Sequence, residues 1–167
     1  MLWWPSWRNW RTMDFYSNQI LEEEDLMPLV RDCLALGRRV RYLPFRGVSM
    51  LPMLRQGIDT VELAPLPEKL KKYDLPVYQY PSGKYVMHRV VAVKENHYVC
   101  LGDNTYAYEY IMQDQMLGVV SAFRRGEKRI EVDALPYRIY CRIWVTIYPM
   151  RKLYRRTRSW ISRHIPH

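Results

Sequence analysis

Four side chains in the middle of this sequence have the chemical types needed for nucleophilic catalysis. Ser49 stands in the stretch FRGVSMLPML, His88 follows in MHRVV, and Asp103 and Glu109 lie in LGDNTYAYEY. A serine hydroxyl becomes an effective nucleophile when a neighbouring base takes its proton. Imidazole suits that work at neutral pH, and a carboxylate can hold its second nitrogen in the productive tautomer. The sequence therefore contains a candidate for each of the three roles.

Each of these residues also has an ordinary structural explanation. Serine beside glycine is common in turns, and the Gly-Asp-Asn sequence at residues 102–104 favours turn geometry as well. A single histidine in a strand is more often structural than catalytic. The order of the three segments and their surroundings, rather than the residue types, favour the catalytic interpretation.

The surrounding pattern predicts a mainly β domain of the α+β class. Residues 19–36 carry apolar side chains at helical spacing and end at Gly37, so we expect an amphipathic helix with Pro28 near its start. From Arg38, about seven short segments rich in β-branched and aromatic residues alternate with turn signals such as PSGK and RRGE. This alternation predicts an antiparallel β-domain with little helix between the strands.

Charge is concentrated at the C-terminal end of the chain. Residues 1–133 have a net charge of +1, whereas residues 134–167 contain eight Lys and Arg and no acid. The spacing predicts a helix there, which Pro149 should kink or split. One interpretation is a helix packed on the body with a solvated basic face. The alternative is a helix on an anionic membrane surface, with candidate contacts at Trp144, Arg151, Lys152, Arg155 and Arg156.

Nucleic acid is not an expected partner, because no recognition motif accompanies the basic charge. The three cysteines, Cys33, Cys100 and Cys141, are too far apart to suggest a disulfide framework or a metal site, so reduced thiols are expected. The chain lacks an apolar run of the roughly 18 residues typical of a membrane-spanning helix. We therefore expect a cytoplasmic or peripheral membrane location.

Three segments follow from these patterns: residues 1–37, with the first helix; residues 38–134, the β-rich domain; and residues 135–167, the basic helix. Residues 1–13, MLWWPSWRNWRTM, lack the features of a signal peptide. Their tryptophans and arginines fit either an interfacial segment or a disordered start.

Several short motifs occur in a characteristic order. Ser49-Met50-Leu51-Pro52 matches a Ser-Met-x-Pro nucleophile box, His88-Arg89-Val90-Val91 places histidine before Arg-Val, and Gly102-Asp103-Asn104 forms a Gly-Asp-Asn box. In this combination, over residues 40–125, the chain resembles the signal peptidase I superfamily of serine endopeptidases, which shares a β-rich fold with LexA-type self-cleaving proteins. Histidine in the base position is similar to the endoplasmic-reticulum type, where most bacterial members have lysine.

The resemblance implies a role for each matching position. Ser49 would be the nucleophile and His88 the base within hydrogen-bond reach of it. Asp103 or Glu109 would orient His88, and we favour Asp103 because its shorter side chain sits in a tight turn. The resemblance also implies an oxyanion site near Gly47 and Met50, and a substrate groove near Val48, Pro52 and Arg89.

The implied substrate is an extended peptide or precursor protein with small residues near the scissile bond, and no metal or organic cofactor is implied. Two departures from the family pattern stand out. Gly47 occupies the position where family members usually have a serine oxyanion donor, so backbone N–H groups would have to serve. The membrane-spanning helix that normally precedes the nucleophile is also replaced by a charged amphipathic helix.

Three other functions fit parts of the sequence. A non-catalytic relative would bind peptide in the same groove, and a membrane-surface adaptor would act through the C-terminal helix. A LexA-type self-cleaving regulator fits less well, because residues 1–37 contain only one convincing helix instead of a helix-turn-helix domain.

Overall fold

A computed structural model of the chain describes residues 12–15, 23–42 and 47–164, with the backbone alone at 12–15, 23–25, 156 and 158–164. The described part is an α+β structure with mostly antiparallel strands, as the sequence predicted. Most of residues 1–13, with their tryptophans, lie outside it. Its elements are β1 (Thr12–Phe15), α1 (Glu23–Ala35), β2 (Arg39–Tyr42), β3 (Thr60–Ala64), β4 (Pro76–Gln79), β5 (Tyr85–Met87), β6 (Arg89–Val93), β7 (Tyr98–Leu101), β8 (Glu109–Ile111), the 3₁₀ turn η2 (Gln113–Gln115), β9 (Met116–Arg125), β10 (Lys128–Glu131), α2 (Leu135–Thr146) and α3 (Tyr148–His164).

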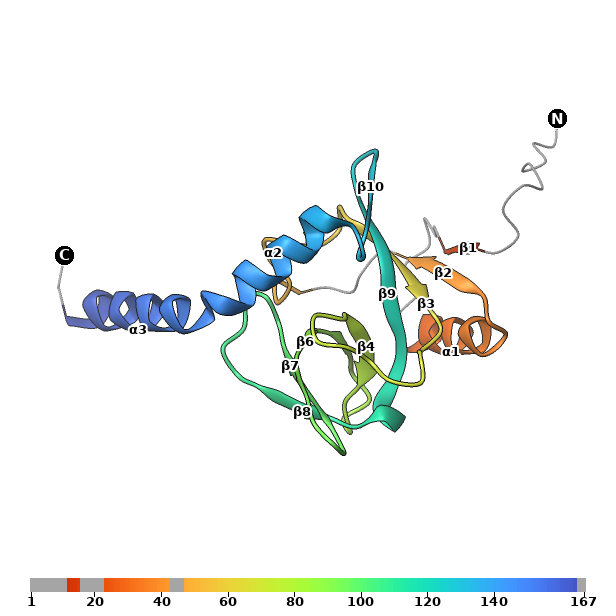
Figure 1. Cartoon of the computed structure of the whole chain (residues 1–167), viewed down its shortest axis with the longest axis horizontal. Helices are drawn as coiled ribbons and strands as arrows, with labels where there is room; N and C mark the ends of the chain where they lie inside the picture. Colours follow the sequence, from red (N-terminus) through yellow and green to blue (C-terminus); the bar gives the residue numbers. More distant parts are fainter. Residues whose placement is uncertain (1–11, 16–22, 43–46, 165–167) are drawn as a thin grey trace.

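The strands form two sheets. The larger has the order β1-β2-β3-β9-β4-β5, with β10 also paired to β9, and the smaller has the order β6-β7-β8. The long strand β9 runs through the middle of the body in Figure 1. β1, which the sequence did not predict, pairs in parallel with β2, so the N-terminal segment contributes to the same sheet as the β-rich domain.

The predicted strand KYVMHRVVAV is divided between the two sheets. β5 closes the edge of the larger sheet and β6 opens the smaller one, with His88 between them. This transition places His88 where the two sheets separate.

Helix α1 covers one face of the larger sheet. It begins and ends within the range that the sequence predicted, and Pro28 lies in its second turn. Met27, Val30 and Leu34 are buried with strand residues of the main core. On β9, a Cβ atom at Gly118 would stand 2.7 Å from a Leu34 methyl group and 3.0 Å from the Ala64 carbonyl oxygen. Glycine at this position therefore lets the helix lie directly against the sheet.

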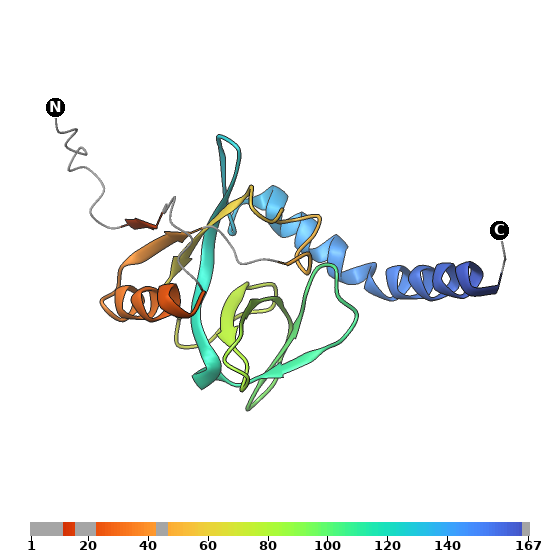
Figure 2. The ribbon, with the colours of Figure 1, turned by 180° about the vertical axis from the view of Figure 1, so that it is seen from behind.

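The C-terminal segment forms two consecutive helices, divided at Ile147 just before Pro149, as the sequence predicted. Figures 1 and 2 show α2 against the body and α3 projecting away from it, at the end of the molecule opposite α1. None of the helices in the described ranges is long and apolar enough to cross a membrane.

A buried carboxylate joins four strands of the larger sheet. Glu62 on β3 is only 3% exposed and receives ion pairs from Arg41 on β2, Arg124 on β9 and Arg129 on β10. Burial disfavours its charged form, but the hydrogen bonds and charges of these arginines outweigh that effect and hold the pKa of Glu62 below its ordinary value. Ionised Glu62 therefore stabilises the sheet.

We predict that Glu62→Gln lowers the free energy of unfolding by about 2 kcal/mol at neutral pH, the usual contribution of hydrogen bonds to a charged group. The depressed pKa makes this contribution full above the ordinary glutamate value near ~4.3, and it is lost as pH falls through the folded-state pKa. Urea unfolding from pH 7 to pH 3 should show the difference from wild type shrinking. The exposed Glu127→Gln is the matched control, and a difference that persists at low pH would contradict the assignment.

Candidate active site

Ser49 lies in the loop between β2 and β3. Buried side chains and a hydrogen-bonded acid near the end of the loop hold this loop in place. Met50, Met53 and Leu54 are buried in the main core. Asp59, which is fully buried, accepts hydrogen bonds from the backbone N–H of Arg55 at 2.9 Å and from its guanidinium at 2.7 Å. These contacts leave Ser49 at the half-buried tip of a well-held turn.

The turn at residues 102–104 holds the Ser49 segment from the side. The Asn104 backbone N–H donates to the Ser49 carbonyl at 2.7 Å, and the Asn104 side chain donates to the Val48 carbonyl at 3.1 Å. A Cβ atom at Gly102 would stand 2.9 Å from the Ser49 carbonyl oxygen and 3.0 Å from Cδ2 of His88. Glycine is needed there because the turn passes between the two candidate catalytic residues.

His88 is almost fully buried, and its Nδ1 edge faces a cluster of polar side chains. Nδ1 lies 2.8 Å from Oε2 of Glu109 and 3.1 Å from the Tyr78 hydroxyl. The hydroxyls of Tyr78 and Tyr80 also donate to Glu109, one to each carboxylate oxygen. Since Glu109 can only accept, this arrangement places the proton of neutral His88 on Nδ1 and leaves Nε2 as the basic nitrogen.

The environment of Glu109 favours its ionised form. Burial disfavours the charge, but hydrogen bonds from His88, Tyr78 and Tyr80 outweigh burial and keep the pKa of Glu109 below its ordinary value. Burial, together with the nearby Glu109 carboxylate, raises the pKa of both tyrosines, so each remains a hydrogen-bond donor. The ionised Glu109 carboxylate can therefore accept a hydrogen bond from Nδ1–H of His88.

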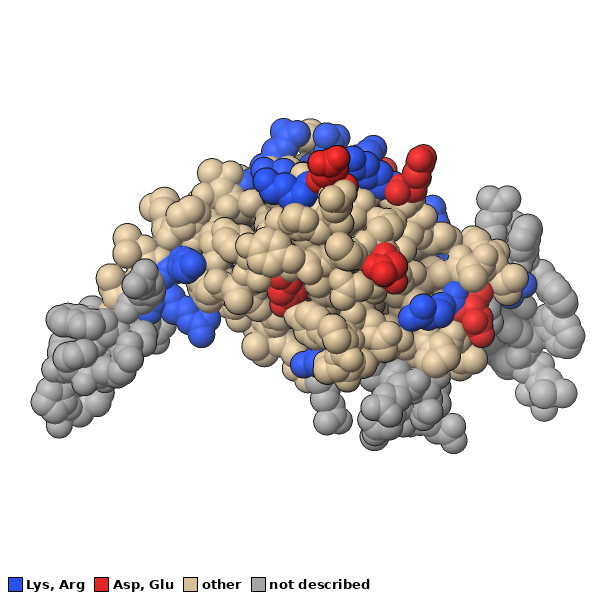
Figure 3. All heavy atoms as spheres, turned by 90° about the horizontal axis from the view of Figure 1, so that it is seen from below, with Lys and Arg blue, Asp and Glu red and all other residues tan. Residues whose placement is uncertain are grey.

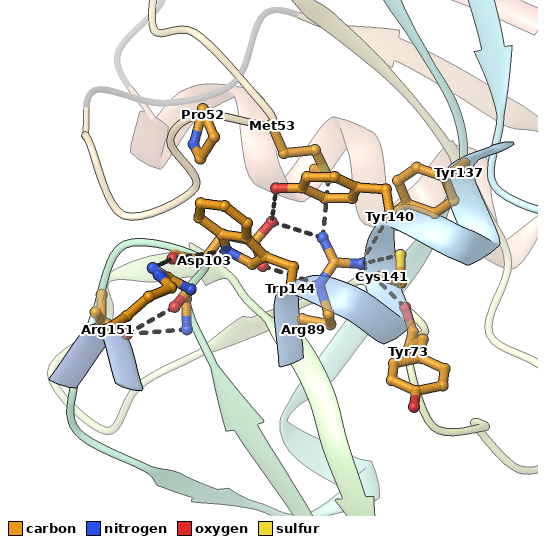
Figure 4. A network of polar contacts seen from close by, with 12 residues as sticks. Pro52, Met53, Tyr73, Arg89, Asp103, Tyr137, Tyr140, Cys141, Trp144 and Arg151 are labelled. Carbon is orange, nitrogen blue, oxygen red and sulfur yellow. Dashed lines mark hydrogen bonds and ion pairs between the residues drawn. The ribbon is translucent and has the colours of Figure 1, made fainter. Parts of the chain in front are cut away.

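Asp103 does not contact His88 in this structure; it pairs with Arg89. Figure 4 shows the guanidinium of Arg89 facing the Asp103 carboxylate, with hydrogen bonds of 2.9 and 2.7 Å to its two oxygens. Both side chains are buried. Despite the opposing effect of burial, neighbouring groups, including Tyr137 and Asp103, raise the pKa of Arg89 well above its ordinary value. The expectation that Asp103 lies against His88 is therefore wrong, and the carboxylate beside Nδ1 of His88 belongs to Glu109.

Helix α2 closes the Arg89–Asp103 network from the other side. Arg89 also donates to the Tyr137 hydroxyl, to Sγ of Cys141 and to Sδ of Met53, each at 2.9 Å. Tyr140 donates to the Asp103 carboxylate at 3.1 Å, and Trp144 donates to the Asp103 backbone carbonyl at 3.0 Å. The network connects α2 to the strand after His88, the turn at residues 102–104 and the Ser49 loop.

Ser49 and His88 line one cleft, with a volume of about 240 Å³. Residues of the Ser49 loop form one wall and the β5 segment forms the other; they include Gly47, Met50, Leu54, Arg55, Lys84, Tyr85, Val86 and Met87. Among the described residues, neither the Ser49 hydroxyl nor Nε2 of His88 has a hydrogen-bond partner. The predicted direct Ser49–His88 hydrogen bond is therefore not confirmed, although the two residues share the cleft.

Two backbone donors are also available beside Ser49. In the described ranges, the N–H groups of Ser49 and Met50 donate to no other residue. The Met50 side chain is buried, whereas Gly47 is exposed and lines the cleft. A backbone oxyanion site therefore depends on the turn and not on a side chain at residue 47.

Other predicted site residues lie elsewhere. Arg89 is fully buried and does not line the cleft of Ser49 and His88, and Pro52 lines two other hollows, one beside Tyr137 and one beside Trp144. Val48 is 58% exposed beside Ser49. Of the predicted membrane contacts, Trp144 and Arg151 face the body, where the Arg151 guanidinium lies 3.9 Å from the Trp144 ring and donates to the Asp103 carbonyl. Lys152 and Arg155 are exposed, and the Arg156 side chain lies outside the described residues.

Sequence reasoning missed the two tyrosines of the histidine cluster. Tyr78 is in β4 and Tyr80 directly follows this strand; their period-two spacing in PVYQY places both side chains on one side of the extended chain. That spacing was the available signal. Glu109 was expected in a loop, but it begins the short strand β8.

In the described ranges, no three His, Cys, Asp or Glu side chains are grouped so that they could hold a metal ion. Cys33, Cys100 and Cys141 are buried, and burial raises the pKa of the Cys100 thiol to about 12. No protein-family model matches the chain, and no curated protein or solved structure is significantly similar to it.

We predict that the two acids differ in their effect on stability. Asp103→Asn leaves the buried Arg89 charge unpaired and should lower the free energy of unfolding by about 3–5 kcal/mol. Glu109→Gln should cost less than half of that, because two of its partners are tyrosine hydroxyls and the carboxylate is partly exposed. Denaturant titration of both variants at neutral pH measures the difference. Equal losses would contradict the division of roles.

Proposed function

We propose that this protein is a serine endopeptidase resembling signal peptidase I, with Ser49 as nucleophile, His88 as base and Glu109 as the orienting acid. One observation carries the proposal: Glu109 engages Nδ1 of His88 at 2.8 Å while His88 and Ser49 line the same cleft. A histidine held in this way presents Nε2 as a base. The proposal includes the signal-peptidase/LexA-like fold, which the order of the motifs supports.

The reaction requires Oγ of Ser49 and Nε2 of His88 to come within hydrogen-bond reach. As a peptide carbonyl enters the cleft, Nε2 of His88 takes the Ser49 proton and Oγ attacks the carbonyl carbon. The resulting oxyanion accepts hydrogen bonds from the N–H groups of Ser49 and Met50. Imidazolium then protonates the leaving amine, and His88 later activates water to hydrolyse the acyl-enzyme. Glu109 stabilises the imidazolium throughout.

The cleft also suits an extended peptide. β5 is at the edge of the larger sheet, and its residues Tyr85–Met87 line the cleft beside His88. An edge strand has free backbone N–H and C=O groups, to which a peptide can add as a further strand. The preference for small residues near the scissile bond rests on the family resemblance.

A peptide-binding protein without cleavage activity is the second candidate. The absence of a hydroxyl side chain at Gly47 and of a direct Ser49–His88 hydrogen bond favours it. A serine-directed reagent distinguishes the two candidates, because only an activated serine reacts quickly.

We predict that a fluorophosphonate probe labels the wild-type protein on Ser49. Ser49→Ala should abolish labelling, and His88→Ala should slow it by roughly 10²–10⁴-fold, the usual contribution of a general base. Gel fluorescence and mass spectrometry of the labelled peptide measure the result. Ser82→Ala, in the exposed turn before β5, is the control and should label normally. Wild-type protein that stays unlabelled while binding peptides would favour the second candidate.

Glu109→Gln should slow labelling by at least roughly 10²-fold without preventing folding, since the amide can neither stabilise imidazolium nor fix the productive tautomer. The exposed Glu95→Gln provides the matched control. Asp103→Asn, assayed where circular dichroism shows it folded, should retain much more activity than Glu109→Gln. The reverse ranking would return the orienting role to Asp103.

A further inference from the structure

The outer face of α2 and α3 carries a row of large apolar side chains that nothing in the described structure covers. Leu135, Ile139 and Ile143 follow one another at intervals of four residues on α2, and Met150 and Leu153 are exposed on α3. Their exposed fractions run from 47% at Ile139 to 73% at Met150. Four-residue spacing places side chains on one side of a helix, so these residues form one stripe.

Packing against the body does not explain the stripe, because the opposite face of the helices is the one that packs against the body. Tyr137, Cys141 and Tyr148 are buried, and Trp144 donates to the Asp103 carbonyl. The helices therefore have one face committed to the body and a second apolar face free for a partner.

The charge around the stripe is of one sign. Arg138 and Arg142 are exposed on α2, and residues 134–167 contain no acid. Lys152 and Arg155 on α3 are also exposed, but they lie over the rings of Tyr148 and Tyr106. Figure 3 shows blue side chains, and no red ones, immediately beside the grey C-terminal end of the molecule. An apolar stripe with acid-free basic flanks is complementary to an anionic lipid surface, where apolar residues enter the acyl boundary and cations contact headgroups.

Other occupants fit less well. A second copy would bring two of these eight-cation segments together across the stripe, and like charges repel. Nucleic acid would satisfy the charge but leave Leu135, Ile139, Ile143 and Met150 exposed to water.

We propose that the outer face of α2 and α3 binds an anionic membrane surface. This site differs from the set expected from sequence: the stripe enters the lipid, whereas Trp144 and Arg151 stay on the body. The inner face can keep its contacts with the Arg89–Asp103 network while the outer face is bound. The inference does not depend on the proposed peptidase activity.

Flotation of the full chain with vesicles tests the proposal. We expect binding to vesicles of phosphatidylcholine with about one-third phosphatidylserine, weak binding to phosphatidylcholine alone, and weaker anionic binding as salt rises. Ile143→Asp and Leu153→Asp should each reduce the binding constant at least about tenfold. Leu36→Asp makes the same change at an exposed position just after the end of α1 and should bind as wild type does. Circular dichroism confirms that each variant is folded.

A second comparison tests the charge. Arg138→Gln with Arg142→Gln should weaken binding at low salt by roughly tenfold or more, whereas Lys69→Gln with Lys94→Gln, also exposed, should not. Ser49→Ala should bind vesicles normally, so loss of activity and loss of binding are distinguishable. The proposal is overturned if anionic and neutral vesicles bind alike, or if Leu36→Asp weakens binding as much as Ile143→Asp. A dimer in ultracentrifugation that Ile143→Asp dissociates would assign the stripe to a second copy instead.

Discussion

The arrangement of the candidate site depends on one buried ion pair, that of Arg89 with Asp103. A buried guanidinium is stable only when its charge and its donors are satisfied, and here an acid, a tyrosine hydroxyl and two sulfur atoms surround it. These partners come from the turn at residues 102–104, helix α2 and the Ser49 loop. Satisfying one charge thereby fixes three segments relative to one another.

Neighbouring residues along the chain have different roles, because their side chains lie on opposite sides of the backbone. His88 faces the cleft while Arg89 enters the ion pair, because successive side chains of an extended chain point in opposite directions. In the turn at residues 102–104, Asp103 holds Arg89 while Asn104 holds the backbone at Val48 and Ser49. The pair thus positions the proposed catalytic residues without being part of the cleft.

Helix α2 has a comparable division. Its inner face supplies Tyr137, Tyr140, Cys141 and Trp144 to the buried network, and its outer face exposes Leu135, Ile139 and Ile143. A partner bound to the outer face would therefore contact the same helix that donates hydrogen bonds to Asp103. This arrangement gives the body and the proposed lipid surface one shared rigid element.

The sequence by itself determined the local structure and the candidate chemistry. Segments rich in β-branched and aromatic residues between turn signals predicted most strands. Helical spacing predicted α1 and the C-terminal helices, and Pro149 predicted their division, because these signals act over a few residues. The residue types and order of Ser49, His88, Asp103 and Glu109 named the groups capable of catalysis. Choosing between the two acids depended on long-range contacts. Only the tertiary structure decided that Glu109 and the two tyrosines of PVYQY surround His88, that Asp103 neutralises Arg89, and that Trp144 faces inward. These outcomes depend on how two sheets and a helix pack, and a local sequence pattern carries no information about which buried charge finds which partner.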